Sequence, residues 1–366
     1  MQLTKLRLFN YRNIEEVEIV PSPGTNLLSG GNGQGKTNIL ESIYLLGYGK
    51  SFRTAIPKDC ILHGRRECLI EGAVEHGELK RSLKISITAE GKRLFLLGKP
   101  VPLEDFVGNL HLLAFTHEHL NVVRGGPADR RAFLDRAMVS LYPGHVKQLA
   151  AYGRTLKQRN GILSSLRDGR GTMDENLLDS WDEALAGPGA RILWNRLRYT
   201  EMMKEELPQG LFSAEKLKMH YVPTVPADDS DVSGIEQRFR ERLLQTRATD
   251  LRTGFTSVGP HRDELKLYVD GKSLADFGSA GQQRSNLLSL YFSQMEIHRR
   301  IHGHYPIFLV DDAEAELDLQ RLQAFMNYLS ERTQVFLTSA KEFLLSSLPK
   351  HTRLFSVHSG AVHTTN

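Results

Sequence analysis

The chain of 366 residues is 40% hydrophobic and 25% charged, and its net charge at neutral pH is +4. This length and composition are ample for sizeable cores in about two or three domains, and the small positive charge is only a weak indication of anionic partners. No apolar run approaches the length of a membrane span, so we expect a soluble protein without a membrane partner.

The start of the chain predicts strands rather than a signal peptide. Apolar and polar residues alternate over 2–9 and 16–20, as in half-buried strands, and residues 10–13 separate the two. The two cysteines, Cys60 and Cys68, have no neighbouring Cys/His cluster. We therefore expect a cytoplasmic protein with reduced thiols, without a metal site or a disulfide framework.

Residues 25–29 predict a third strand, and the loop after it fits the pattern G-x-x-x-x-G-K-[ST]. Apolar residues recur at helical spacing from Ile39 to Leu46, so a helix follows the loop. A Gly-rich turn can match the pattern by chance, but strand, loop and helix together favour nucleotide binding. The loop consists of Gly30, Gly31, Asn32, Gly33, Gln34, Gly35, Lys36 and Thr37.

The chemistry of this loop suits the phosphates of ATP. Its glycines allow backbone N–H groups to curl around phosphate oxygens, and the helix start adds free N–H groups and a positive dipole end. Lys36 is predicted to reach the β- and γ-phosphates, and Thr37 is predicted to bind Mg²⁺.

A basic loop, an antiparallel meander and a buried strand are the next predicted segments. The loop at 47–54 is either solvated or in contact with nucleotide or DNA, and its residues favour neither use. Alternation over 69–97, with turns at Gly77 and Gly91, predicts the meander. The apolar run 112–115 predicts the buried strand.

From about residue 121 to 249 the pattern predicts helices. Apolar stripes over 144–168, 177–207 and from 233 onward are expected to pack on one another, and binding of a partner helix is the less favoured use. The sequence Gly187-Pro188-Gly189 is expected to break or kink the second helix.

Charge is unevenly divided across the helical part. Residues 111–170 hold ten basic against four acidic residues, a net charge of +6, whereas residues 171–250 have a net charge of −5. Such an excess is usually a solvated face, but the basic half is where contacts to a DNA backbone are predicted. The candidates are Arg124, Arg130, Arg131 and Arg136. For Arg130 and Arg131 the alternative is a structural role in ion pairs near Asp129 and Asp135.

Residues 306–312 predict a strand that is buried on both faces and ends in two carboxylates. If this strand belongs to a parallel sheet, the two acids lie beside the P-loop. Asp311 is then predicted to hold Mg²⁺, through water or through Thr37. Asp312 is the candidate catalytic residue, predicted to orient or polarise the attacking water. The alternative is a pair of acids in an ordinary turn after a strand.

A second stretch of small residues, 277–285, begins a long helical pattern. Its backbone N–H groups and Ser279 are predicted to face an anion, and the alternative is that the stretch is a polar cap of the helix. Gly281 lies 246 residues after Gly35 but only 30 before Asp311. This order, with Leu317-Asp318 at its end, resembles the plan of ATP-binding-cassette (ABC) ATPases, in which a signature loop completes the nucleotide site of a second subunit. Here that loop would consist of Ser279, Ala280, Gly281 and Gln282.

Within the ABC ATPases, the chain could be a transporter subunit or a chromosome-maintenance-type head. Transporter subunits typically place the signature nearer the P-loop and carry a histidine after the next strand, but residues 335–340 contain none. Long coiled-coil members need hundreds of arm residues, and residues 121–249 are far too few.

The whole chain closely resembles the RecF family of bacterial recombination and repair ATPases, because many short motifs occur in one shared order. These motifs are Tyr11-Arg12-Asn13, the P-loop, and residues 49–54, 127–135, 259–265, 278–284, 311–312 and 316–318. The departures from the family pattern are Thr116-His117-Glu118-His119, Gly187-Pro188-Gly189 and Ala313-Glu314.

The resemblance implies a weak, DNA-stimulated ATPase that dimerises head to tail on ATP. It implies binding to single-stranded and double-stranded DNA and their junctions, and action with RecR and RecO to help load recombinase. It also adds Arg12 and Asn13 to the expected nucleotide-binding residues.

The sequence therefore predicts an α/β fold with ATP and Mg²⁺ as cofactors. Residues 1–120 and 250–366 are expected to form an ABC-type ATPase head with an antiparallel β subdomain, and residues 121–249 an inserted all-helical arm. The competing class is a metabolic P-loop enzyme such as a kinase, which would need a second-substrate pocket and would have no use for a signature loop. Another chromosome-maintenance-type ATPase head is the nearer alternative.

Overall fold

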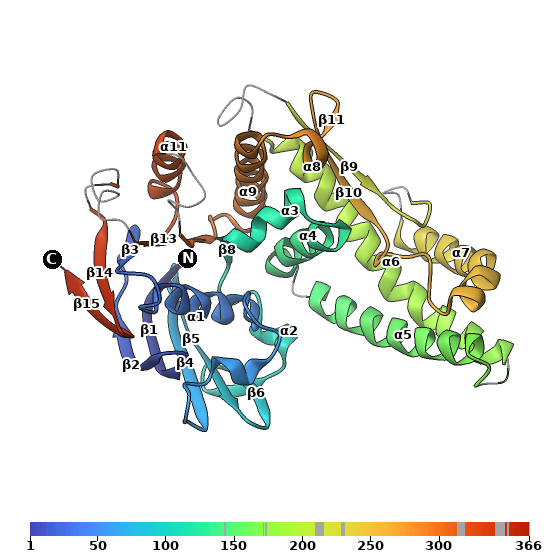
Figure 1. The fold of residues 1–366 in the computed structure, drawn as a ribbon, viewed down its shortest axis with the longest axis horizontal. Coiled ribbons are helices and arrows are strands. Elements are labelled where there is room, and N and C mark those ends of the chain that lie inside the picture. Colours follow the sequence, from blue (N-terminus) through green and yellow to red (C-terminus); the bar gives the residue numbers. More distant parts are fainter. Residues whose placement is uncertain are drawn as a thin grey trace. The chain divides into compact units, whose positions relative to one another are not determined.

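The computed structural model describes residues 1–142, 144–170, 172, 174–208, 216–227, 231–312, 319–340, 348–349 and 351–365 (Figure 1). The chain divides into two compact units. We call them the head unit, Met1–Leu120 with Tyr291–Asn366, and the arm unit, Asn121–Leu290. The predicted motifs at 313–314 and 316–318 lie outside the described residues.

An antiparallel sheet of the head unit has six strands in the order β2-β1-β4-β5-β6-β7 (Figure 1). Alternate residues of β4 and β5 are buried, so the predicted meander is confirmed, as are the two strands at the start of the chain. The strands are β1 (Gln2–Tyr11), β2 (Ile14–Ile19), β4 (Glu67–His76), β5 (Leu79–Thr88), β6 (Gly91–Leu96) and β7 (Lys99–Val101).

The second sheet of the head unit has the order β15-β14-β3-β13-β12-β8, and its pairs are parallel except the β14–β15 hairpin. Every residue of β8 and β12 is buried, as their apolar runs predicted. The strands are β3 (Thr25–Ser29), β8 (Leu112–Phe115), β12 (Ile307–Val310), β13 (Val335–Ser339), β14 (Arg353–His358) and β15 (Ala361–Thr365).

Helix α1 (Lys36–Tyr48) packs against strands of both sheets, which explains why it is apolar on nearly all sides. A Cβ on Gly47 would lie 2.5 Å from Leu112 Cδ2 in the parallel sheet. A Cβ on Gly72 of the antiparallel sheet would lie 2.7 Å from Leu46 Cδ1. The missing side chains therefore allow the helix to approach both sheets closely.

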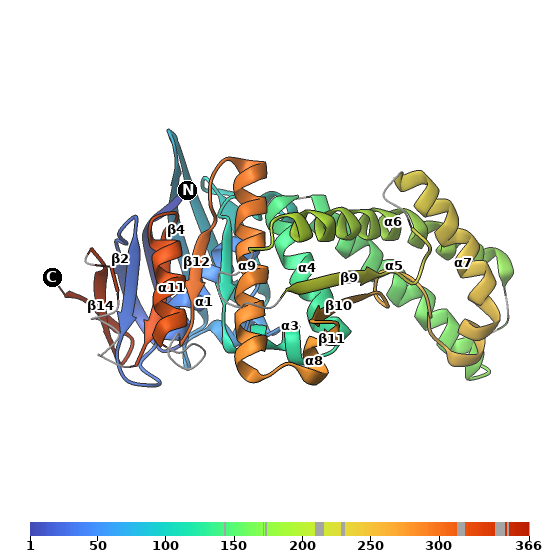
Figure 2. The ribbon, with the colours of Figure 1, turned by 90° about the horizontal axis from the view of Figure 1, so that it is seen from above.

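Helix α11 (Leu319–Ser330) also belongs to the head unit, where it lies beside the strands of the parallel sheet (Figure 2). Its Phe325 ring packs edge-on against Phe308 of β12, with ring centroids 5.3 Å apart, and both rings are fully buried. The described residues of this unit also form the short helical segments η1 (Pro57–Cys60), α2 (Leu103–Phe106) and η2 (His117–Leu120).

The arm unit is mainly helical, and its long helices bury one shared apolar cluster that includes Tyr152, Leu185 and Phe239 (Figure 2). The predicted packing of the stripes on one another is therefore confirmed. The helices are α3 (Asn121–Arg124), α4 (Pro127–Leu141), α5 (Gly144–Arg167), α6 (Glu175–Glu205), α7 (Val232–Thr253) and α8 (Leu274–Phe277). The division between the two units falls within α9 (Ala280–His302).

The expectation of an all-helical arm was wrong in one respect. Strand β9 (Leu217–Val222) lies within residues 121–249 and pairs antiparallel with β10 (Glu264–Val269), which in turn pairs with β11 (Lys272–Ser273). The arm unit accordingly extends to Leu290 rather than ending at residue 249. Backbone pairing across more than forty residues is not visible in a local pattern.

Of the expected break or kink at Gly187-Pro188-Gly189, the break was wrong, because α6 is continuous from Glu175 to Glu205 with the proline inside it, and the kink stays a prediction. Proline removes one helical N–H donor, but packing compensates for that loss. A Cβ on Gly189 would lie 2.2 Å from Phe239 Cε1, so this glycine admits the phenyl ring of α7 directly against the helix backbone.

No helix among the described residues is both long and apolar enough to cross a membrane. Cys60 and Cys68 are buried, free thiols. Burial raises the pKa of Cys60 to about 11 and that of Cys68 to about 12, so neither thiolate forms at neutral pH.

A fully buried arginine joins three helices of the arm unit. Arg159 of α5 donates from Nε to Asp182 Oδ1 on α6 at 2.6 Å, and from Nη1 to Asp250 Oδ2 on α7 at 2.8 Å. The second carboxylate oxygen of Asp250 accepts from the backbone N–H and hydroxyl of Ser257. A buried cation with these partners fixes how the helices pack.

Replacing Arg159 by Ala is expected to lower the free energy of unfolding by about 3–5 kcal/mol, because the carboxylates on α6 and α7 lose their buried cation. Urea denaturation measures this loss. Arg167→Ala is the matched control on the same helix, since Arg167 is half-exposed and pairs with Asp168, and its loss is expected to stay below about 1 kcal/mol. Equal losses in the two proteins would contradict the assigned role of Arg159.

Candidate nucleotide-binding site

The P-loop begins directly after β3 and ends in α1, as predicted. Gly30, Gly33 and Gly35 have φ angles of 149°, 77° and 116°, a region that side chains rarely adopt. A Cβ on Gly30 would lie 2.3 Å from Val357 O, and one on Gly35 would lie 2.9 Å from Asn13 Oδ1. Glycine is therefore required at both positions by backbone conformation and by space.

Lys36 is nearly buried, and its ammonium is fixed over the loop by two backbone carbonyls. Nζ donates to Gly30 O at 2.7 Å and to Gly31 O at 2.8 Å. Gly31 and Asn32 at the tip of the loop are exposed to solvent, where phosphate oxygens can approach. The cation thus lies at the base of an accessible loop, as its predicted role requires.

Gln34 attaches the loop to the β14–β15 hairpin. Its Oε1 accepts from Ser359 N at 2.7 Å, and its backbone carbonyl accepts from Gly360 N at 2.9 Å. Asn13 Nδ2 also donates to the backbone carbonyl of Gln34, at 3.2 Å. Asn13 Oδ1 accepts from Asn38 Nδ2 at 2.7 Å. Asn13 therefore lies against the loop, and the structure gives it a positioning role.

Arg12 contacts α1 rather than the loop itself. Its guanidinium forms a two-pronged pair with the fully buried Glu41, at 2.9 and 2.6 Å, and Nη1 donates to Asp59 O at 2.7 Å. Burial alone would lower the pKa of Arg12, but Glu41 outweighs this effect and raises that pKa above its ordinary value. Contact of Arg12 with nucleotide stays a prediction.

The basic loop at 47–54 folds back toward α1. Ser51 Oγ donates to Glu41 Oε1, and Arg53 Nη1 donates to Asn38 Oδ1 at 2.6 Å, one residue beyond Thr37. The loop therefore lies close to the phosphate-binding residues, although its contact with nucleotide or DNA stays a prediction. The sequence analysis missed Glu41. An acidic residue within an otherwise apolar helical pattern could have identified it.

Thr37, in the first turn of α1, meets Asp311, which follows β12, at the carboxyl end of the parallel sheet, where β13 lies between β3 and β12. Thr37 Oγ1 donates to Asp311 Oδ1 at 2.9 Å, and Thr338 Oγ1 donates to the same oxygen at 2.8 Å. A hydroxyl and a carboxylate oxygen at this spacing fit a Mg²⁺ ion, which prefers such oxygen ligands. Thr338 was missed at the sequence level, although it follows the apolar run of β13 as Asp311 follows β12.

Asp312 is exposed at the same sheet edge and has a φ of 53°, an unusual value for a residue other than glycine. Its backbone N–H donates to Thr338 Oγ1 at 2.8 Å. The structure thus holds Asp312 in a strained conformation beside the residues that fit Mg²⁺, a type of strain that often occurs at functional positions.

The predicted signature loop lies in the arm unit at the start of α9. Ser279 N donates to Gln282 Oε1 at 2.7 Å, and Gln282 N donates to Ser279 Oγ at 3.2 Å. These reciprocal bonds form a capping box, so the local role is that of a helix cap. Ser279 and Ala280 are exposed, with Gly281 following in the helix, and completion of a partner's nucleotide site stays a prediction.

The four candidate DNA-contacting arginines differ in their surroundings. Arg130 forms a two-pronged pair with Glu264 at 2.8 and 3.1 Å and is also bonded to Gly125 O. These bonds favour a structural role for this residue, although the paired acid is Glu264 and not Asp129 or Asp135. Arg131 donates to Asp263 O at 2.8 Å. Arg124 is exposed, although its Nε donates to Gln283 Oε1 at 2.7 Å, and Arg136 is half-buried, so these two, which have no acidic partner among the described residues, remain the better candidates.

Comparisons with known proteins find relatives that match almost the whole chain. The sequence model described as "RecF/RecN/SMC N terminal domain" matches residues 2–363. The "DNA replication and repair protein RecF" of Streptococcus thermophilus is 34% identical over 99% of both chains. The protein of the same name from Geotalea uraniireducens is 35% identical over 99% of this chain and 100% of its own.

The fold is also similar to those of solved structures. "Structure of the recombination mediator protein RecF-ATP in RecFOR pathway" has a TM-score of 0.90 at 27% identity and covers 100% of this chain and 97% of its own. A chromosome-maintenance SmcHead structure has a TM-score of 0.56 at 13% identity over 100% of this chain, and it indicates the fold alone. Since the family model matches residues 2–363 and these relatives are 34–35% identical over 99% of the chain, the chain belongs to the RecF family.

Proposed function

We propose that this protein is an ATP-dependent DNA-binding protein of recombinational repair and replication-gap processing. The observation that carries the proposal is the convergence of Thr37, Asp311 and Thr338 beside a P-loop, in a chain that resembles RecF proteins over its full length. The relatives' names supply the repair role, and the site supplies a chemical reason for its dependence on ATP.

In this proposal each residue of the site acts on the bound nucleotide in a defined way. Lys36 binds the β- and γ-phosphates, and Thr37 and Asp311 hold Mg²⁺, whose charge offsets that of the phosphates. Asp312 accepts a hydrogen bond from the attacking water and takes its proton as hydrolysis proceeds. Hydrolysis is slow and serves as a switch.

The second half of the cycle requires two copies of the chain. Ser279 to Gln282 of one subunit face the nucleotide bound by the P-loop of the other, so ATP joins two heads and the resulting dimer clamps DNA. Hydrolysis then releases the dimer. The exposure of Ser279 and Ala280 at a helix start supports this arrangement, because backbone N–H groups there can meet phosphate oxygens.

RecR and RecO are the proposed protein partners, with which the clamp helps to load recombinase at gaps. Support comes from the pathway named for the structure with a TM-score of 0.90. A metabolic P-loop enzyme is the second candidate function, and monomeric turnover that ignores DNA would favour it.

ATP hydrolysis measured with no DNA, single-stranded DNA, duplex DNA and gapped duplex tests the proposal. We expect DNA to stimulate hydrolysis and ATP to strengthen DNA binding, with an affinity that falls as salt rises because phosphate contacts release counterions. Stimulation should be lost as salt weakens DNA binding. Hydrolysis by a monomer at one rate under all four conditions would contradict the proposed function.

Charge reversal at Arg124 or Arg136 separates specific contacts from general charge effects. Each reversal is expected to reduce the slope of log affinity against log salt by about one unit if the arginine contacts a phosphate. Arg242→Glu is the matched control, since Arg242 is exposed in the acidic half of the arm unit. An unchanged slope in all three proteins would exclude these arginines from the DNA contact.

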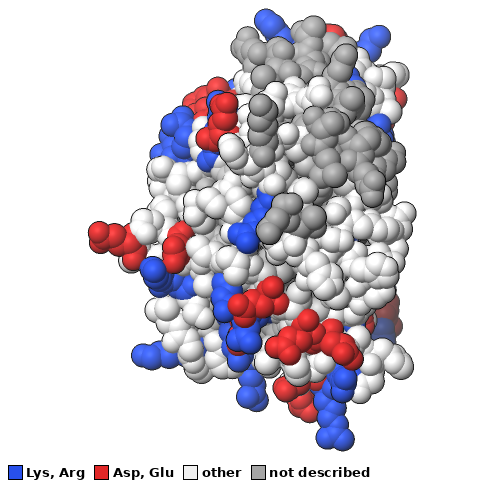
Figure 3. All heavy atoms as spheres, turned by 90° about the vertical axis from the view of Figure 1, so that its left-hand side faces the viewer, with Lys and Arg blue, Asp and Glu red and all other residues white. Residues whose placement is uncertain are grey.

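The head-unit face that includes β14 and β15 is a less suitable DNA surface. Basic and acidic side chains are interspersed among its described residues (Figure 3). Cross-strand ion pairs such as Lys5–Glu18, at 2.8 Å, also neutralise basic charge within the antiparallel sheet of this unit. Mixed charge gives little net attraction for a phosphate backbone, so the search for contacts is better directed to the basic half of the arm.

A further inference from the structure

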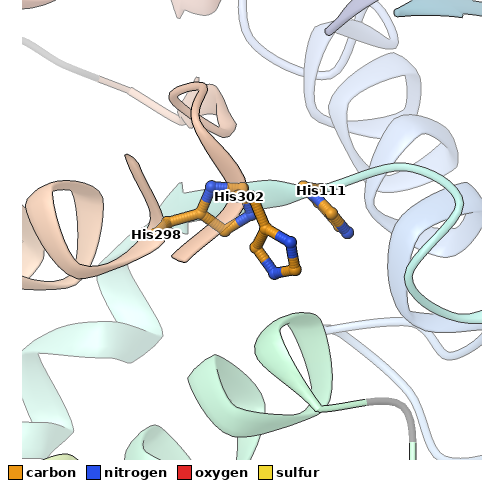
Figure 4. A group of neighbouring side chains, drawn as sticks. All are labelled: His111, His298 and His302. Carbon is orange, nitrogen blue, oxygen red and sulfur yellow. The ribbon is translucent and has the colours of Figure 1, made fainter. Parts of the chain in front are cut away.

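Three histidines of the head unit form a cluster that the ATP site does not use. His111 immediately precedes β8, while His298 and His302 lie near the end of α9 (Figure 4). Their candidate ligand nitrogens all lie within 4.8 Å of one another. From this geometry we propose that His111, His298 and His302 form a binding site for a divalent transition-metal ion of the zinc class.

The spacing of the two helical histidines suits chelation. Residues four apart lie on the same face of a helix, and paired histidines at this spacing bind zinc in other helical sites. The ring centroids of His298 and His302 are 4.6 Å apart, and the His111 ring lies 4.5 Å from the first and 4.6 Å from the second. One cation can therefore be reached from two separate chain segments.

A buried nitrogen without a hydrogen-bond partner supports the same site. His298 is only 3% exposed, and its Nδ1 lies 2.8 Å from His304 O. A carbonyl only accepts, so Nδ1 carries the hydrogen and Nε2 carries a lone pair. Nε2 is buried and has no hydrogen-bond partner among the described residues, which is costly in a packed interior unless a cation can accept the lone pair.

His304 completes a supporting layer around the site. Its Nδ1 lies 3.0 Å from His302 O, and its Nε2 lies 3.2 Å from His111 Nδ1. Hydrogen bonds from histidine rings to carbonyls and to other rings are the usual means by which ligand histidines are oriented.

The donor set selects the class of metal. Three imidazoles without a carboxylate suit zinc, cobalt, nickel or copper and not Mg²⁺ or Ca²⁺, which prefer oxygen ligands. Tetrahedral zinc with bonds of about 2.0–2.1 Å needs ligand nitrogens about 3.3 Å apart, so small ring rotations must close the present spacing. Water can supply the fourth ligand, and the half-exposed side of His302 gives access from solvent.

The histidine cluster lies at the amino ends of β8 and β12, whereas the nucleotide-binding residues lie at the carboxyl ends of the parallel strands. His111 O accepts from Ile307 N at 2.9 Å where β8 and β12 begin, whereas Asp311 follows the end of β12. The metal would therefore join α9 to the residue that precedes β8 and is hydrogen-bonded to the first residue of β12, in a structural role distinct from phosphate chemistry.

Zinc binding is tested on the full chain without a histidine-rich purification tag, after treatment with EDTA and dialysis. Calorimetric titration with Zn²⁺ alone is expected to show one ion per chain, and the midpoint of thermal unfolding is expected to rise with Zn²⁺ concentration. His298→Gln and His302→Gln should each weaken binding by about 100-fold or more, and the double substitution should abolish it. His63→Gln, at an exposed histidine of the same unit, should bind like wild type.

Co²⁺ provides a measurement that needs no variant. Strong visible absorption typical of tetrahedral cobalt is expected in wild type, and it should disappear when Zn²⁺ is added but persist in excess Mg²⁺. ATP binding by each variant shows that its head unit is folded. Absence of the cobalt spectrum, or one tightly bound zinc ion in the double variant, would overturn the proposal and leave the cluster as neutral rings packed against one another.

Discussion

The Asp312→Asn protein is expected to hydrolyse ATP about 100-fold or more slowly than wild type while binding ATP normally. Asparagine keeps the size and much of the hydrogen bonding of aspartate, but its amide cannot take a proton from water. It also tolerates the positive φ of this position, so the backbone bond to Thr338 Oγ1 should be preserved. The variant should accumulate as an ATP-bound dimer that holds DNA longer than wild type.

Single-turnover hydrolysis, nucleotide-binding titration and light scattering with ATP measure these effects separately. Asp270→Asn is the matched control, because Asp270 is an exposed acid with a φ of 49° in the turn between β10 and β11. It should hydrolyse ATP like wild type. Rapid hydrolysis by the Asp312 variant would remove this residue from the catalytic role and leave Asp311 as the acid to be tested.

Lys36→Ala and Ser279→Arg are expected to fail in different ways and to complement each other in part. Lys36→Ala should lose tight ATP binding, because the ammonium opposite the phosphates is removed. Ser279→Arg should bind ATP normally but neither dimerise nor hydrolyse it, since a bulky cation in the signature loop would obstruct the partner's nucleotide. Mixed together, they can restore at most one composite site per dimer.

The Ser279 result needs a control for the helix cap. Ser279→Ala removes the hydroxyl that accepts from Gln282 N but adds no bulk, and a lost cap costs only about 1 kcal/mol. It should therefore retain dimerisation with ATP. Light scattering and ATPase assays of each protein and of the mixture decide the matter. Wild-type hydrolysis by monomeric Ser279→Arg would exclude a composite site.

Much of the head could be predicted because its signals are local or depend on chain order. The P-loop needs glycines at fixed positions, and the structure explains two of them by positive φ and by close approach of Val357 and Asn13. The apolar run before Asp311 predicted a strand buried on both faces. Parallel pairing then brings the strand's carboxyl end to Thr37, so the meeting of these residues follows from the fold class.

Several features that the sequence did not predict depend on partners distant in the sequence. Nothing near Arg130 identifies Glu264, 134 residues away, as the acid that pairs with it. The Gly187-Pro188-Gly189 sequence has a poor helix propensity, but the fit of Phe239 against Gly189 outweighs it. Strand β9 has only six residues, and its strand character depends on pairing with β10.

The chain order of the parallel sheet also determines when a newly made protein can bind ATP. Thr37 and Asp311 are 274 residues apart, so at about 5–20 residues per second the ribosome needs on the order of half a minute to supply the second after the first. During that interval β3 has neither of its eventual neighbours, β13 and β14, whereas the arm unit emerges as one uninterrupted segment. The arm is therefore able to fold during translation, while chains released early have no nucleotide site and expose to chaperones and proteases an unpaired strand that is buried in the complete fold.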